Sequence, residues 1–186
     1  MVDGGSGDRT AELAAGRCDR VLSTRRGRAG QMNAGAREAQ GDALLFLHAD
    51  TRLPPGAEEI IFRALRFYTW GRFDVRIEGR HWLLPVVAAG MNLRSRFTGI
   101  ATGDQAIFVR RPSFAGFPEI PLMEDVAFSK AMRRLGRPAC LREKVATSGR
   151  RWEARGPLRT IVLMWRLRFL YAMGAAPERL ARLYEK

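Results

Sequence analysis

Two side chains that can bind or carry charge follow directly after an apolar stretch of the sequence. Leu44–Leu47 is continuously apolar, and His48 and Asp50 come next, before a Pro-Pro turn. An apolar run of this length, bounded by turn residues, predicts a buried, parallel-type strand over 43–49. A core strand that ends on an imidazole and a carboxylate either caps the following turn or holds a polar ligand.

Other carboxylates stand at the ends of predicted strands or at the starts of predicted helices. Asp3 ends a short strand, and Glu124 and Asp125 open a predicted helix. Adjacent carboxylates repel each other when both are ionised, whereas a helix N-terminus favours the anion. First-turn acids usually stabilise their helix, and the alternative is a general base within hydrogen-bond reach of a substrate hydroxyl.

The histidines and cysteines limit the metal chemistry that the chain can carry. There are two histidines, and the two cysteines, Cys18 and Cys140, are too far apart for a CxxC pair. This excludes a typical zinc site or disulfide framework, so we interpret both cysteines as small buried residues in a reducing cytoplasm. A bound metal would need oxygen ligands, which favours Mg²⁺ or Mn²⁺.

The elements that must position these groups are predicted from periodicity and turn residues. The predicted helices are 10–16, 30–41, 54–68, 81–97, 124–136 and the region from Pro157 onward. The predicted strands are 20–24, 43–49, 71–79 (half-buried), 100–111, 138–143 and 145–148. Alternating helices and strands in the first half predict a parallel sheet covered by helices, and the second half adds antiparallel or mixed strands.

The chain is basic, with a formal net charge of +13, but its arginines are dispersed rather than gathered in one arm. We therefore expect no nucleic-acid partner. The apolar segment 158–174 is interrupted by Arg159, Arg166 and Arg168, and it is too short to span a membrane. It could lie in a membrane interface as a basic amphipathic helix, but we favour a helix that packs on the domain with its arginines outward.

Four ordered stretches resemble family 2 glycosyltransferases: VDGGSGDRT (2–10), GRAGQMNAGAREAQGDALLFLHADTRLP (27–54), GDQAIFVRR (103–111) and PLMEDVAFSKAMRRLGRP (121–138). They look most like the bacterial arsenosugar-biosynthesis-type subgroup, which is associated with radical-SAM and selenium proteins. The resemblance implies an α/β GT-A fold, with a Rossmann-like mixed sheet and helices on both faces. It also implies an inverting, metal-dependent sugar transfer from a nucleotide-sugar to a hydroxyl acceptor.

The resemblance also implies a division of labour along one domain, 1–186. Residues 1–100 would form the nucleotide-sugar-binding half, 101–156 the acceptor and catalytic half, and 157–186 the C-terminal helices. Asp50 would bind the metal, and His48 replaces the first carboxylate of the family's Asp-x-Asp motif.

The remaining roles follow from the same motifs. Asp125, next to Glu124, would be the catalytic base. The implied donor-binding residues are Asp3, Gly4, Arg28, Gln31, Asn33 and His48. The implied acceptor or sugar residues are Gly103, Asp104, Gln105, Arg151 and Trp152. For Arg28 the alternative is a solvated surface arginine, and for Trp152 it is a half-buried ring beside a surface arginine.

One departure concerns the start of the chain. The family opens with a strand and a helix before the VDGGS segment, so we expect the first βα unit of the fold to be missing here. The acceptor is expected to be a small molecule or a lipid. The location is expected to be cytoplasmic, with peripheral contact at the inner membrane face through the C-terminal helix. The alternative functions are a non-catalytic basic protein that binds membrane or nucleic acid, and an inactive truncated transferase.

Overall fold

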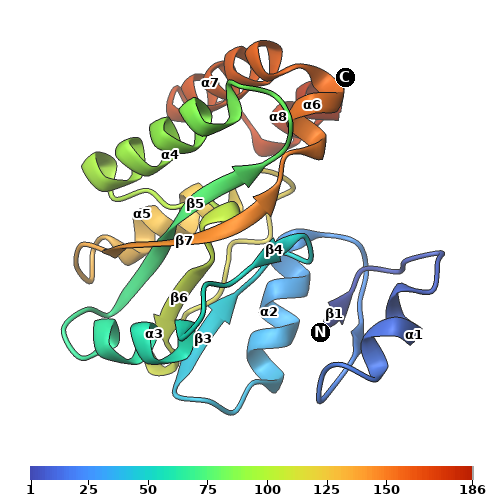
Figure 1. Cartoon of the computed structure of the whole chain (residues 1–186), viewed down its shortest axis with the longest axis vertical. Helices are drawn as coiled ribbons and strands as arrows, with labels where there is room; N and C mark the ends of the chain where they lie inside the picture. The colour runs from blue at the N-terminus through green and yellow to red at the C-terminus, as the bar shows by residue number, and fades with distance from the viewer. Residues whose placement is uncertain (186) are drawn as a thin grey trace.

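A two-stranded and a five-stranded sheet organise residues 1–185, which are the residues described by this computed structural model (Figure 1). Strands β1 (Val2–Asp3) and β2 (Leu22–Ser23) pair in parallel and form the small sheet. The large sheet has the order β3-β6-β5-β7-β4. Its strands are β3 (Ala43–Phe46), β4 (Thr51–Arg52), β5 (Trp70–Glu78), β6 (Ile107–Arg110) and β7 (Ala139–Ser148).

Helices cover both faces of the large sheet, which confirms the predicted mixed α/β fold class. One core cluster packs α2 (Arg28–Glu38) and α5 (Glu124–Met132) against β3 and β6. A second cluster packs α3 (Ala57–Leu65) and α4 (Leu84–Thr98) with β5 and β7. The other elements are α1 (Thr10–Ala15), η1 (Gly103–Gln105), η2 (Arg111–Ser113), α6 (Arg150–Arg155), α7 (Pro157–Ala172) and α8 (Pro177–Glu185).

Strand β3 differs from the predicted parallel strand in both its length and its pairing. It ends at Phe46, pairs antiparallel with β6, and forms the edge of the five-stranded sheet. Its apolar run is explained by burial on both faces, because Leu44 belongs to the cluster with α2 and Leu45 packs against the cluster with α3. A continuous apolar run indicates that both faces of a strand are buried, but it does not show whether the neighbouring strand is parallel or antiparallel.

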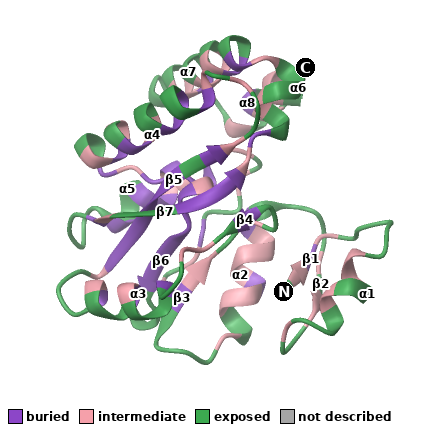
Figure 2. Ribbon diagram, in the orientation of Figure 1, coloured by how far each residue is buried: buried purple, intermediate pink, exposed green. Residues whose placement is uncertain are grey.

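Strand β5 was predicted as half-buried but lies in the interior of the sheet (Figure 2). Even Arg72 is fully buried, where it forms an ion pair with Asp74 and donates hydrogen bonds to Ser95 Oγ and to the carbonyl of Asn92. Asp74 also accepts a hydrogen bond of 2.6 Å from Arg96. Arg72 and Asp74 therefore form an internal network with α4, whereas Arg76 further along the strand faces water.

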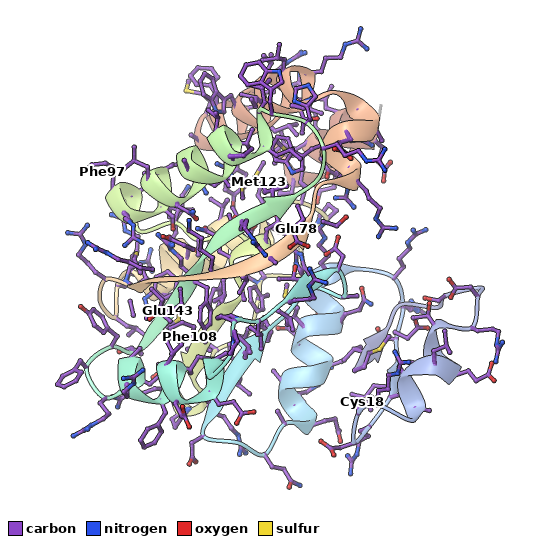
Figure 3. The ribbon with its side chains drawn as sticks, viewed as in Figure 1. Cys18, Glu78, Phe97, Phe108, Met123 and Glu143 are labelled. Atoms are coloured by element: carbon purple, nitrogen blue, oxygen red, sulfur yellow. The ribbon has the colours of Figure 1, made fainter. Side chains whose placement is uncertain are left out.

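The predicted strands 138–143 and 145–148 form one strand, β7, which runs parallel to β5. The register is irregular between the pairs made by Arg72 and Asp74, and Arg142–Lys144 in this part of β7 are exposed. The segment 150–155, which was not predicted as a helix, forms α6. Figure 3 shows Phe108 among the strands and Phe97 on the outer side of α4.

The C-terminal region is helical as predicted, up to Glu185. Helices α7 and α8 share a cluster with the start of α5, in which Leu167 and Leu180 are fully buried. None of the helices in the described part of the chain is long and apolar enough to cross a membrane.

Candidate active site

A cavity of about 1450 Å³ extends from β1 and α2, past the end of β3, to the space between α4 and α7. Its walls include the loop after β3, the start of η1 and the N-terminus of α5. Three distant segments of the sequence line this cavity, with His48 and Asp50, with Asp104, and with Glu124 and Asp125. The candidate site therefore lies at the end of β3, beside the polar residues that follow this strand.

His48 lies next to a carboxylate from another segment of the chain, which the Asp-x-Asp motif did not predict. Its Nδ1 lies 3.3 Å from Oδ1 of Asp104, which comes from η1. Gly103 permits this approach, since a Cβ there would lie 2.5 Å from Nε2 of His48. Asp50, two residues after His48, is exposed at the wall of the same cavity.

The Asp104 carboxylate is surrounded by protein on one side and opens on the cavity on the other, and this affects its pKa. Its side chain keeps 42% exposure because it opens on the cavity, although protein atoms surround it closely. Burial raises the pKa of the Asp104 carboxyl. The interaction with His48 and the charges of Arg28 and Arg151 lower this pKa by more than burial raises it, so the net pKa is below its ordinary value. Asp104 is thus an anion suited to a cation on the cavity side.

Asp125 and Glu124 have different surroundings at the start of α5. Asp125 lines the cavity and accepts hydrogen bonds from the N–H of Gly103 at 3.1 Å and from its own helix at Val126. Glu124 is buried, and its nearest cation is Arg28, 3.8 Å away. Burial, followed by repulsion from Asp125, raises the pKa of Glu124. Asp125 is thus the carboxylate of the two that lines the cavity with its position fixed by backbone donors.

The predicted donor residues divide into two groups. Arg28, Gln31 and His48 line the cavity. Asn33 does not line it, because its amide exchanges two hydrogen bonds with the backbone of Phe117 and joins α2 to that loop.

Asp3 and Gly4 end β1 and lie outside the lining of the cavity. The Asp3 carboxylate accepts hydrogen bonds from Gly5 and Ser6 and shapes the turn that follows. Gly4 packs against Gln31, where a Cβ would lie 2.8 Å from the amide. Both residues therefore support the wall formed by α2.

The predicted acceptor residues also divide. Gly103, Asp104, Arg151 and Trp152 line the cavity. Gln105 is fully buried behind it, where its amide completes a capping box with Thr102. Arg151 donates a hydrogen bond of 2.7 Å to the Tyr184 hydroxyl, which fixes its position beside α8.

Two arginines that sequence reasoning did not assign to the site also line the cavity, Arg94 on α4 and Arg168 on α7. We expected the arginines of 158–174 to point outward. That holds for Arg159 and Arg166, which are exposed, but is wrong for Arg168. The sequence signal for this position was the interruption of the apolar run by Arg168. The helix face that carries Arg168 is otherwise apolar and buried.

The donor set at the cavity suits a hard cation that also takes ligands from a substrate. The part of the chain that is described has no cluster of three or more His, Cys, Asp or Glu side chains placed to hold a metal alone. Mg²⁺ and Mn²⁺ commonly bind one or two carboxylates together with phosphate oxygens. Asp50 and Asp104 fit that pattern.

Three solved structures have a fold similar to that of this chain. S. aureus TarS 1–349 is similar, with a TM-score of 0.55 and 17% identity, over 80% of this chain and 50% of that chain. Glucosyl-3-phosphoglycerate synthase from Mycobacterium tuberculosis, in complex with Mn²⁺ and UDP-glucose, gives 0.53 and 16%, over 78% and 57%. The mannosyltransferase PcManGT from Pyrobaculum calidifontis, in complex with GDP-Man and Mn²⁺, gives 0.57 and 20%, over 98% and 58%.

These similarities show a GT-A-type glycosyltransferase fold, and the chain spans between about half and three fifths of the length of the chains it resembles. The sequence profile of glycosyl transferase family 2 matches residues 1–123, so the chain belongs to that family. No curated protein matches it significantly.

Proposed function

We propose that this glycosyltransferase moves a sugar from a nucleotide-sugar to a hydroxyl acceptor by a single displacement that inverts the anomeric centre. One observation carries the proposal: Asp50, Asp104 and Asp125 line a single cavity, and Gly103, next to Asp104, donates a hydrogen bond to Asp125. Family membership supports the reaction class. Two structures of similar fold are described with Mn²⁺ and a nucleotide-sugar.

The donor would lie along α2 and the end of β3. Asp50 and Asp104 would hold a Mg²⁺ or Mn²⁺ ion, which when bound neutralises charge on the departing diphosphate. Arg28 adds a positive charge at the first turn of α2, where free backbone N–H groups also favour phosphate. Asp3, Gly4 and Asn33 hold the wall that the nucleotide would contact.

The acceptor would approach Asp125. As its hydroxyl oxygen bonds to the anomeric carbon, the bond from that carbon to the diphosphate oxygen breaks, and the hydroxyl proton passes to a carboxylate oxygen of Asp125. Two backbone N–H groups hold that carboxylate in place before the reaction. Gly103, Asp104, Gln105, Arg151 and Trp152 would shape the space for the sugar and the acceptor.

The test separates donor binding from turnover. Mn²⁺-dependent binding of nucleotide-sugars, measured by calorimetry over a panel of donors, should be lost in Asp50→Ala and retained in Asp125→Asn. Turnover of the bound donor should fall by about 10²-fold or more in Asp125→Asn. Asp19→Ala, which removes an exposed carboxylate far from the cavity, is the matched control and should match the wild type. Metal-independent binding that survives Asp50→Ala would contradict the assignment.

We also propose peripheral contact of α7 with an anionic membrane surface. The helix and the residue that follows it expose large apolar side chains at helical spacing, among them Trp165 (72%), Phe169 (66%) and Met173 (73%). The exposed cations Arg159 and Arg166 belong to the same helix, and the chain carries a net charge of +13. Apolar side chains beside cations are the pattern of an interfacial helix on anionic lipid.

Vesicle sedimentation tests this contact. We expect binding to phosphatidylglycerol vesicles and little binding to phosphatidylcholine vesicles, with the affinity reduced several-fold in Phe169→Ser. Phe62→Ser on α3 changes a side chain of similar exposure (72%) and should leave vesicle binding intact. If Phe169→Ser instead abolished a dimer seen in solution, the apolar face would belong to a second copy of the chain and the membrane contact would be refuted.

A further inference from the structure

Arg94 and Arg168 are partly buried cations whose buried nitrogens lack hydrogen-bond partners. Within residues 1–185, Nε and Nη2 of Arg94 and Nε of Arg168 are inaccessible to solvent and donate no hydrogen bond. Both side chains line the candidate active-site cavity, one from α4 and one from α7. Buried guanidinium groups without an acceptor are costly, because they lose hydration and gain no hydrogen bond in return.

Other enclosed or half-enclosed arginines of the chain are satisfied. Arg72 is fully buried, yet it forms an ion pair with Asp74 and two further hydrogen bonds. Arg96 bonds to Asp74 and to the carbonyl of Cys140. The unmet donors are therefore specific to the cavity and are not a general feature of how this fold buries arginine.

The electrostatics point the same way. Burial, followed by repulsion from Arg168, lowers the pKa of Arg94 to about 10. Burial also lowers the pKa of Arg168, while the charges of Asp125 and Asp104 oppose that shift. The charge of Asp125 acts on both arginines from a distance, but neither arginine forms an ion pair with a carboxylate among the described residues. An anion placed at the pair would supply both charge and acceptors.

We propose that Arg94 and Arg168 bind an anionic phosphoryl group of the acceptor, which places a hydroxyl of the same molecule at Asp125. This rests on the proposed function, because it names the acceptor class of that site: a hydroxyl compound that carries a phosphate a short distance from the reacting oxygen. The pair belongs to α4 and α7, whereas the residues assigned to the donor belong to α2, the end of β3 and η1.

Inorganic phosphate is the first probe, because its binding needs no turnover. We expect phosphate to raise the melting temperature of the wild-type protein and to bind about tenfold more weakly, or worse, to Arg94→Met and to Arg168→Met. Methionine retains an unbranched apolar stem, so both variants should fold, and without phosphate they should melt at or above the wild-type temperature. Arg166→Met, which removes an exposed cation from the same helix, is the matched control and should behave as wild type.

A second arm separates the acceptor from the donor. UDP and GDP, each with Mn²⁺, should bind the two methionine variants as they bind the wild type. If diphosphate binding fell as much as phosphate binding, the pair would serve the donor and the acceptor assignment would be overturned. Equal phosphate binding in all variants, or lower melting temperatures without phosphate, would show that the arginines are structural. Asp50→Ala should retain the phosphate response, so this inference and the donor site can fail separately.

Discussion

At the scale of single residues, Glu124 and Asp125 show how neighbours in sequence acquire different properties. Asp125 has two backbone donors and an opening to the cavity, whereas Glu124 is buried with a single cation 3.8 Å away. Burial, and then repulsion from the adjacent Asp125, raise the pKa of Glu124. This separates a carboxylate that can accept a proton from one that resists ionisation.

The raised pKa of Glu124 predicts how stability depends on pH. Its burial, and then the charge of Asp125, raise this pKa above the ordinary 4.5. The stability that the neutral form contributes is full below pH 4.5 and is lost as the pH rises through the folded-state pKa. Glu124→Gln should therefore unfold like wild type near pH 4 and at a higher denaturant concentration near pH 8.

Denaturant unfolding at both pH values checks this expectation, and Glu119→Gln serves as the control because Glu119 is exposed. A Glu124→Gln variant that is less stable than wild type at pH 8 would mean that the Arg28 ion pair outweighs the cost of burying the charge.

The sequence located individual chemical groups better than it located their partners. Asp50, His48 and Asp125 could be singled out because each follows a strand or opens a helix. The pairing of His48 with Asp104 could not, since it depends on β3 and η1 meeting across the cavity. The sequence also could not predict that the Arg168 side chain points into the cavity. The side of α7 that faces solvent is known only once the neighbours of the helix are known.

At the scale of elements, the alternation in β5 was the most misleading pattern. Apolar and charged residues alternate there as in a strand with one wet face, yet α4 covers the charged residues Arg72 and Asp74 in the first half of the strand. Ion pairing inside the fold replaces contact with water, and sequence periodicity does not distinguish the two cases. The core apolar positions were predictable, but the internal network required the partner residues on α4.

This network predicts a stability effect for Asp74. Asp74→Asn leaves the fully buried Arg72 and the partly buried Arg96 without their shared carboxylate. Removing one member of a buried ion pair typically costs about 3–5 kcal/mol. Equilibrium unfolding should therefore show a loss of this size for Asp74→Asn, whereas the exposed Glu143→Gln on β7 should stay within about 0.5 kcal/mol of wild type. A loss below about 1 kcal/mol for Asp74→Asn would indicate that water replaces the carboxylate.

At the scale of the whole molecule, the two sheets do not join. Strand β1 pairs only with β2 and β3 only with β6 within the described chain, so each has an edge without a strand partner. The cavity runs between them, along Val2, β3 and small residues of α2 that include Gly35 and Ala36. Unpaired edges next to an apolar groove are suited to receive another strand.

These edges have room for one further strand, of the kind that the βα unit of the family resemblance would supply. Such a strand would join the two sheets and complete the wall against which the nucleotide would lie. A protein to which a βα unit with such a strand is added ahead of Met1 should therefore melt several degrees higher than residues 1–186 and bind nucleotide-sugar about tenfold more tightly or better. The matched control is the same extension with two prolines in the predicted strand, which cannot donate ladder hydrogen bonds and should remove both gains. Equal melting temperature and donor affinity in all three proteins would show that the groove between β1 and β3 needs no further strand.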